Sequence, residues 1–107
     1  MLKLEDILKI LNTVCNKYDN IRVGVAGSYA NGTQTPNSDI DIVIDGDSTQ
    51  VEIMEFVKSL FEITVDVLWV DLMQKEDNEL DQLAIDFDLP INNNSVYKTV
   101  MREVVWV

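Results

Sequence analysis

Polar residues near the middle of the chain have the types and spacing that phosphate and metal chemistry requires. The stretch VAGSYANGTQTPNSDIDIVID (Val25–Asp45) places Gly27 and Ser28 after a strand-like run, and Asp39 and Asp41 follow ten residues later. A helical turn beginning at Ser28 would point free backbone N–H groups outward, where they bind anions. Gly27 would let a phosphate approach the backbone closely. The pair therefore suggests a phosphate-binding turn, although an ordinary tight turn with a helix N-cap fits it equally well.

Asp39 and Asp41 suggest a metal site. They stand two residues apart in a strand-like run, so both side chains should project from one face, while Ile40, Ile42 and Ile44 point into a core. Two carboxylates that close repel each other by roughly 4 kcal/mol at an effective dielectric constant of about 20. A bound Mg²⁺ would turn that repulsion into attraction. The alternative is a pair of exposed acids on an edge strand.

A third carboxylate, Asp66, interrupts the apolar run from Ile63 to Val70. A charge within such a strand is disfavoured unless something compensates it. If this strand pairs with the Asp39 strand, Asp66 can point at the same place. Three carboxylates beside a phosphate-binding turn are the parts of a two-metal phosphoryl-transfer site. Pairing of Asp66 with Arg22 or Lys58 would also explain it.

Composition narrows the chemistry further. The 107 residues contain no histidine, which excludes Ser-His-Asp and Cys-His catalysis and histidine-bearing zinc sites. The single cysteine, Cys15, cannot form an internal disulfide and is expected to be a partly buried helix residue. Nineteen acidic residues against eight basic ones give a net charge of −11, which argues against nucleic-acid binding but suits a local divalent-cation site.

The elements that must position these residues follow from periodicity and turn signals. Helices are expected where apolar residues recur at helical spacing. Strands are expected where apolar residues alternate with polar ones or form a continuous run. A capping box at Thr49 and Glu52 should open the second helix, with Val51, Met54, Val57 and Phe61 on its apolar face, and Ser95 should cap the last one. The predicted helices cover 2–18, 49–61, 75–89 and 95–102, and the predicted strands cover 21–26, 39–44, 63–70 and 104–107.

This order predicts an α/β (α+β) domain, a small mixed β-sheet with helices packed against it, with residues 1–107 as one domain. No apolar run approaches the ~20 residues that cross a bilayer. The N-terminal segment MLKLEDILKI is charged and amphipathic, unlike a signal peptide. We therefore expect a cytoplasmic protein without membrane contact. The composition leaves the oligomeric state open.

Several other residues receive a structural role. Asp45 and Asp47 flank a turn before a predicted helix, where capping and solvation explain them. Asp86 and Asp88 fall on a predicted helix, where residues two apart do not share a face. We assign neither pair a metal role. Trp69, Phe87 and Trp106 are interpreted as core or interface residues.

The combined pattern resembles the DNA polymerase β-like nucleotidyltransferase superfamily. The motif G-S-Y-A-x-G from Gly27, followed by S-D-I-D-I-x-I from Ser38, is similar to that of its minimal single-domain members, the MNT proteins, which are often paired with a HEPN-domain toxin. The resemblance covers residues 2–70 well, with Asp66 in the expected strand. The closing segment 98–107 is similar to the short helix and terminal strand of minimal members.

This resemblance implies an activity and a site. Asp39, Asp41 and Asp66 would be the catalytic, metal-binding carboxylates for two Mg²⁺ ions, and Gly27 and Ser28 would bind the nucleotide phosphates. The substrate would be a nucleoside triphosphate, ATP in the paired members. The AMP group would pass to a hydroxyl, plausibly a tyrosine of a HEPN-type partner, which would make the protein an antitoxin of a toxin–antitoxin system.

The chain departs from the family pattern within the turn. Many relatives carry arginine in motifs such as G-S-R-A-R-G, where this chain has Tyr29 and Asn31. Without the positive charge of that arginine, we expect weaker binding of a triphosphate. Two alternatives therefore stay open: a weak or inactive member that neutralises its partner by contact, using the acidic helix from Glu76 to Asp88, and a small-molecule nucleotidyltransferase like the aminoglycoside enzymes.

Overall fold

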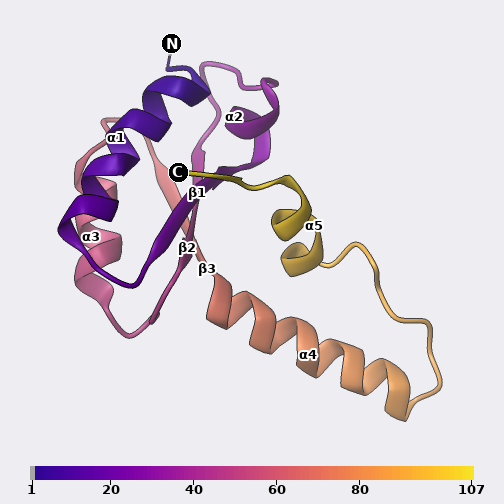
Figure 1. Cartoon of the computed structure of the whole chain (residues 1–107). Coiled ribbons are helices and arrows are strands. Elements are labelled where there is room, and N and C mark those ends of the chain that lie inside the picture. Colours follow the sequence, from indigo (N-terminus) through magenta and orange to yellow (C-terminus); the bar gives the residue numbers. More distant parts are fainter. Residues whose placement is uncertain (1) are drawn as a thin grey trace.

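The structure, a computed structural model, describes residues 2–107. Within them, helices lie against both faces of a four-stranded mixed sheet (Figure 1). The sheet has the order β3-β2-β1-β4, in which β2 is parallel to β3 and all other neighbours are antiparallel. The predicted fold class is confirmed. The elements are α1 (Leu4–Lys17), β1 (Arg22–Ala26), α2 (Gly27–Asn31), β2 (Ile40–Asp45), α3 (Val51–Ser59), β3 (Val65–Trp69), α4 (Val70–Asp86), α5 (Val96–Glu103) and β4 (Val105–Trp106).

The bounds of β3 and α4 differ from prediction. The strand begins at Val65 and ends at Trp69, and α4 follows at Val70 without a loop, five residues before the predicted start at Lys75. The apolar run alone could not reveal this change of conformation. Val70 is buried as the first residue of the helix, so its hydrophobicity serves a helix rather than a strand. The helix also ends earlier than expected, at Asp86.

The predicted capping box at the start of α3 is wrong. The N-cap is Gln50, and no side chain caps the helix. The Thr49 hydroxyl instead donates to Asp47 Oδ1 at 2.7 Å, and the Thr49 N–H donates to the same oxygen at 2.9 Å. Asp47 thus forms an Asx turn, in which its carboxylate accepts the hydrogen bonds of the Thr49 N–H and hydroxyl. The buried face of α3 is also shifted, because Val51 is 47% exposed whereas Ile53 is buried.

The main core lies between α1, α3 and one face of the sheet. Ile40, Ile42 and Ile44 of β2 all point into it and are fully buried, as their alternation predicted. Two aromatic residues close this core, because Tyr29 and Trp69 are also buried there. Cys15 is a partly buried residue of α1, as expected.

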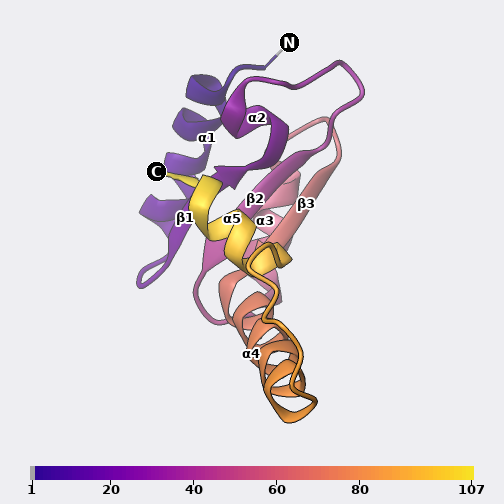
Figure 2. The same cartoon turned by 90° about the vertical axis from the view of Figure 1, so that its right-hand side faces the viewer.

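The opposite face of the sheet is covered by α5 and the start of α4 (Figure 2). Val43 of β2 and Ala26 of β1 are buried there, against a side chain group that includes Tyr97 and Met101. Ser95 is the N-cap of α5, as predicted, and its hydroxyl accepts a bond from the Lys98 backbone N–H at 3.3 Å. Because α5 is short, this face of the sheet is covered only in part.

Helix α4 extends away from the body of the molecule (Figure 1), and the principal extents are 45 × 30 × 19 Å. Only its first turns lie near the sheet. Across residues 2–107, no helix combines the length and the apolar character that a bilayer span requires.

Candidate active site

The register of the sheet brings two of the predicted carboxylates together. Asp41 of β2 lies opposite Asp66 of the parallel strand β3, and on its other side opposite Ala26, the last residue of β1. Neighbouring strands lie about 4.8 Å apart, and residues in register project to the same face. The structure therefore places Asp41 and Asp66 side by side, on the face opposite the main core.

Gly27 approaches this pair from the end of β1. It has φ +68°, in the left-handed region that favours glycine. A Cβ placed at Gly27 would collide with Asp41 Oδ2, so the residue must lack a side chain to lie against that carboxylate. Helix α2 begins at Gly27 itself with Ala26 as its N-cap, which means that Ser28 is a residue of the first turn and not the cap.

The electrostatics of Asp41 reflect this crowding. Burial raises the pKa of its carboxyl above the ordinary value of 3.8, and the negative charges of Asp66 and then Asp39 raise that pKa further. All three causes disfavour the ionised form. A divalent cation at this position would oppose them.

Asp39 raises the pKa of Asp41 less than Asp66 does. It precedes the first residue of β2 and its side chain is exposed. Within the part of the chain that the structure describes, no three Asp, Glu, Cys or His side chains are gathered closely enough to hold a metal ion. Mutual repulsion of carboxylates favours side-chain rotamers that keep them apart.

Two structural alternatives for these acids are wrong. Strand β2 is not an edge strand, since it lies between β1 and β3. Asp66 forms no ion pair with any described residue; Arg22 instead pairs with Asp45 at 3.1 Å and covers the Trp106 ring at 3.9 Å. The acids at the site are therefore not explained by ion pairing.

The turn residues that replace arginine have structural roles. Tyr29 is only 3% exposed and belongs to the main core. Asn31 accepts hydrogen bonds at Oδ1 from the backbone N–H and the hydroxyl of Thr33, which closes the turn after α2. Neither side chain is arranged to hold a phosphate.

Three of the four acids that were assigned structural roles have local partners, whereas Asp88 lies beyond the end of α4 with φ +54° and not on the helix as predicted. Asp45 pairs with Arg22, and Asp47 accepts from Thr49, which lowers the Asp47 pKa. On α4, Asp86 accepts from Gln82 at 2.9 Å.

The donor set at the site suits magnesium. Carboxylate oxygens are the ligands that Mg²⁺ prefers, and Asp41 is a partly buried carboxylate that neighbouring negative charges destabilise. Asp41 and Asp66 could hold such an ion between β2 and β3, with Asp39 at the margin. Gly27 lies directly against the Asp41 carboxylate, so the backbone at the end of β1 belongs to the same site.

The chain is similar in sequence to known proteins. The sequence model of the nucleotidyltransferase domain family matches residues 7–107. The protein adenylyltransferase MntA of Thermococcus cleftensis is 27% identical over 116 residues, covering 100% of this chain and 98% of that protein. A crystal structure of a toxin–antitoxin with AMP-PNP contains a chain with a TM-score of 0.48 and 24% identity, covering 78% of this chain and 68% of that one.

Proposed function

Because the chain belongs to the nucleotidyltransferase domain family, we propose that it transfers AMP from ATP to a hydroxyl of a partner protein, in a Mg²⁺-dependent reaction. The observation that carries this proposal is the convergence of Asp41, Asp66 and Gly27 at one end of the sheet. Its relative MntA is a protein adenylyltransferase, which supports AMP as the transferred group and a protein as the acceptor.

The residues take the following roles in this proposal. Asp41 and Asp66, with Asp39, would hold the Mg²⁺ ions, whose charge would offset that of the triphosphate and of the departing pyrophosphate. Gly27 exposes its backbone to the β- and γ-phosphates, and Ser28 contributes its hydroxyl. Asp66 is more exposed than Asp41, so in this proposal it is the carboxylate that faces the incoming acceptor.

The transfer is a single in-line displacement. The acceptor hydroxyl oxygen attacks the α-phosphorus, and the bond from that phosphorus to the oxygen bridging to the β-phosphate breaks. Pyrophosphate leaves with the electron pair, and the hydroxyl proton passes to the Asp66 carboxylate. The product is a phosphodiester between AMP and the acceptor.

The resemblance to minimal members makes a HEPN-type toxin the proposed partner and one of its tyrosines the proposed acceptor. Modification would neutralise the toxin, which gives the chain an antitoxin role in the cytoplasm. The alternative of neutralisation by contact alone is supported by Tyr29 and Asn31, whose structural roles leave the turn without a cation.

The deciding experiment incubates the protein with Mg²⁺, α-labelled ATP and the candidate toxin. Label should move onto the toxin, and peptide mapping should place it on a tyrosine. Binding to the toxin without label transfer would support contact neutralisation instead. Transfer to a small hydroxylated compound in place of the protein would support the small-molecule alternative.

Restoring the family's missing charge should strengthen nucleotide binding. We expect Asn31→Arg to lower the Kd for Mg-ATP roughly fivefold, because one exposed ion pair contributes up to about 1 kcal/mol. Asn31→Gln is the control, since it also removes the Asn31 contact to Thr33 but adds no charge. Calorimetric titration measures both. Equal affinities for the two variants would show that phosphates do not bind near this turn.

A further inference from the structure

A cavity of about 420 Å³ lies between α4 and the segment 92–97, and none of the carboxylates of the candidate active site lines it. Its apolar lining includes Leu68, Met73 and Tyr97, and its rim includes Leu80 and Val96. Among these apolar groups stands one buried acid, Asp77 of α4, which also lines the cavity. The cavity is large enough for a long side chain from another molecule.

The buried negative charge of Asp77 is only partly balanced by hydrogen bonds and ion pairs. It is 4% exposed, and its Oδ1 has no hydrogen-bond partner among the described residues. Its Oδ2 lies 3.7 Å from the Lys98 ammonium, beyond hydrogen-bond length. A buried carboxylate oxygen left without a donor costs about 1–3 kcal/mol or more. This site therefore favours an added hydrogen-bond donor.

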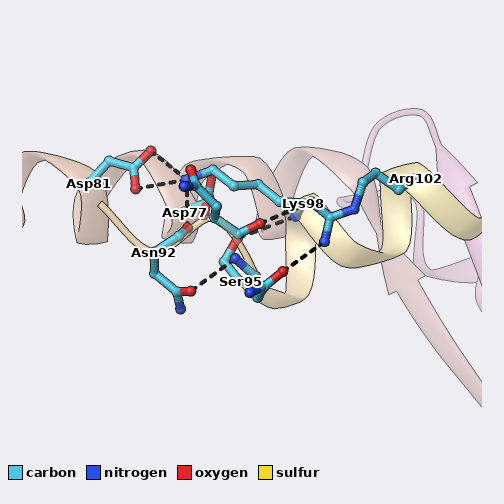
Figure 3. Close-up of polar contacts among 8 residues, drawn as sticks. Asp77, Asp81, Asn92, Ser95, Lys98 and Arg102 are labelled. Carbon is cyan, nitrogen blue, oxygen red and sulfur yellow. Dashed lines mark hydrogen bonds and ion pairs between the residues drawn. The ribbon is translucent and has the colours of Figure 1, made fainter. Parts of the chain in front are cut away.

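Lys98 cannot supply that donor, because its hydrogen-bonding capacity is already used. Its ammonium donates to both carboxylate oxygens of Asp81 at 3.0 Å and to the Asn92 carbonyl at 2.9 Å (Figure 3). An ammonium has three N–H groups. Two cations are present here, Lys98 and Arg102, whose guanidinium donates to Asn94 Oδ1 at the cavity. Three acids, Glu76, Asp77 and Asp81, outnumber them, so the local charge is negative and suits a further cation.

An exposed apolar stripe continues from this cavity along α4. Leu72, Leu80, Leu83 and Phe87 are each more than half exposed. At about 100° per residue they fall within an arc of about 80° on one side of the helix, with Phe87 as its C-cap, and the exposed acid Glu76 lies within the same arc. Leu80 belongs to both the stripe and the cavity rim. An exposed helical stripe of this kind is typical of a surface that binds another helix.

We propose that this surface, the stripe with the Asp77 cavity, docks a basic amphipathic helix of the partner protein. The apolar face of that helix would lie on the stripe, and one of its Arg or Lys side chains would enter the cavity and donate to Asp77 Oδ1. Charge complementarity favours this occupant over a second copy, because each copy carries a net charge of −11.

This inference deepens the proposed function, since it describes how the acceptor protein is held. It can fail separately, because docking is measured by binding and transfer by label. An Asp77 variant leaves Asp41 and Asp66 unchanged, so its affinity for Mg-ATP should equal that of the wild type.

The test uses a capped amphipathic helical peptide of Leu, Ala and Gln with one central Arg, and the same peptide with citrulline in its place. Citrulline keeps the shape of arginine but is neutral. We expect the Arg peptide to bind about tenfold more tightly to the full chain, as one charge-assisted hydrogen bond implies. NMR shifts on binding should include the backbone amides of Asn94 and Ser95.

Matched variants test whether the preference for the Arg peptide depends on Asp77. Asp77→Asn should remove the preference for Arg over citrulline, whereas Asp71→Asn, the same change at an exposed position of α4, should retain it. Val96→Lys adds a cation to the exposed rim without disturbing a buried group, so it should weaken binding of the Arg peptide. Val96→Glu should not weaken that binding. This second pair keeps the test valid if Asp77→Asn is unstable.

Three results would overturn the inference. The first is equal binding of the two peptides to the wild-type chain. The second is binding of spermidine as tight as that of the Arg peptide, which would indicate a small cationic ligand instead. The third is a dimer in light scattering that Phe87→Ser dissociates, which would show that a second copy covers the stripe.

Discussion

Asp41→Asn should lower AMP transfer about a thousandfold and at the same time stabilise the fold at neutral pH. The loss corresponds to about 4 kcal/mol of transition-state stabilisation, as expected when a ligand that holds a catalytic metal ion is neutralised. Label transfer to the partner measures the first effect. Calorimetric or spectroscopic melting measures the second.

The stability gain follows from the raised pKa of Asp41. The folded state binds the Asp41 proton more tightly than the unfolded chain does, so protonation stabilises the fold. That contribution is fully present below the ordinary pKa of 3.8 and is lost as the pH rises through the raised pKa. The melting temperatures of wild type and Asp41→Asn should therefore coincide at low pH and separate at neutral pH, with the variant higher.

Magnesium should reverse the order of the two melting temperatures, so that the wild type becomes the more stable protein. The ion would relieve the repulsion among Asp41, Asp66 and Asp39, so Mg²⁺ should raise the melting temperature of the wild type and leave the variant unchanged. Asp45→Asn is the control, since it removes one charge from the same strand but from the Arg22 pair. If Asp41→Asn transferred label at the wild-type rate, Asp41 would not belong to the catalytic site.

Gly27→Ala should lower transfer about a hundredfold. Its methyl group would collide with Asp41 Oδ2 and turn that carboxylate away from Asp66, and misplacement of a reacting group by about 1 Å costs rates of this order. The positive φ of 68° adds a backbone penalty of about 1–2 kcal/mol in stability. Label transfer and chemical denaturation measure the two effects.

Gly32→Ala is a matched control for this substitution. Gly32 also has a positive φ, of 80°, but a Cβ there would meet no atom within 4 Å. Both variants should lose similar stability, while only Gly27→Ala should lose transfer. Equal loss of transfer in both variants would mean that the conformation of α2, and not the Asp41 contact, supports activity.

The sequence by itself determined most of the local structure. The alternation of Ile40, Ile42 and Ile44 predicted a strand with one buried face, and the structure buries all three. Ser95 and the short apolar tail predicted the last helix and strand, which are present. These signals succeed because they reflect local geometry, a two-residue period or a cap that satisfies its own turn. That residues 1–107 form a single domain stays a prediction.

Only the tertiary structure decided which of these residues meet. Parallel pairing of β2 with β3 sets Asp66 beside Asp41, and the same sequence pattern would have allowed Asp66 to pair with Arg22. Asp77 belongs to no sequence motif, although an acid at helical spacing between Met73 and Leu80 is a signal of a buried carboxylate. Register and burial depend on contacts between distant segments, which local periodicity does not encode. Asp77 is buried only because α5 and the segment before it pack against α4.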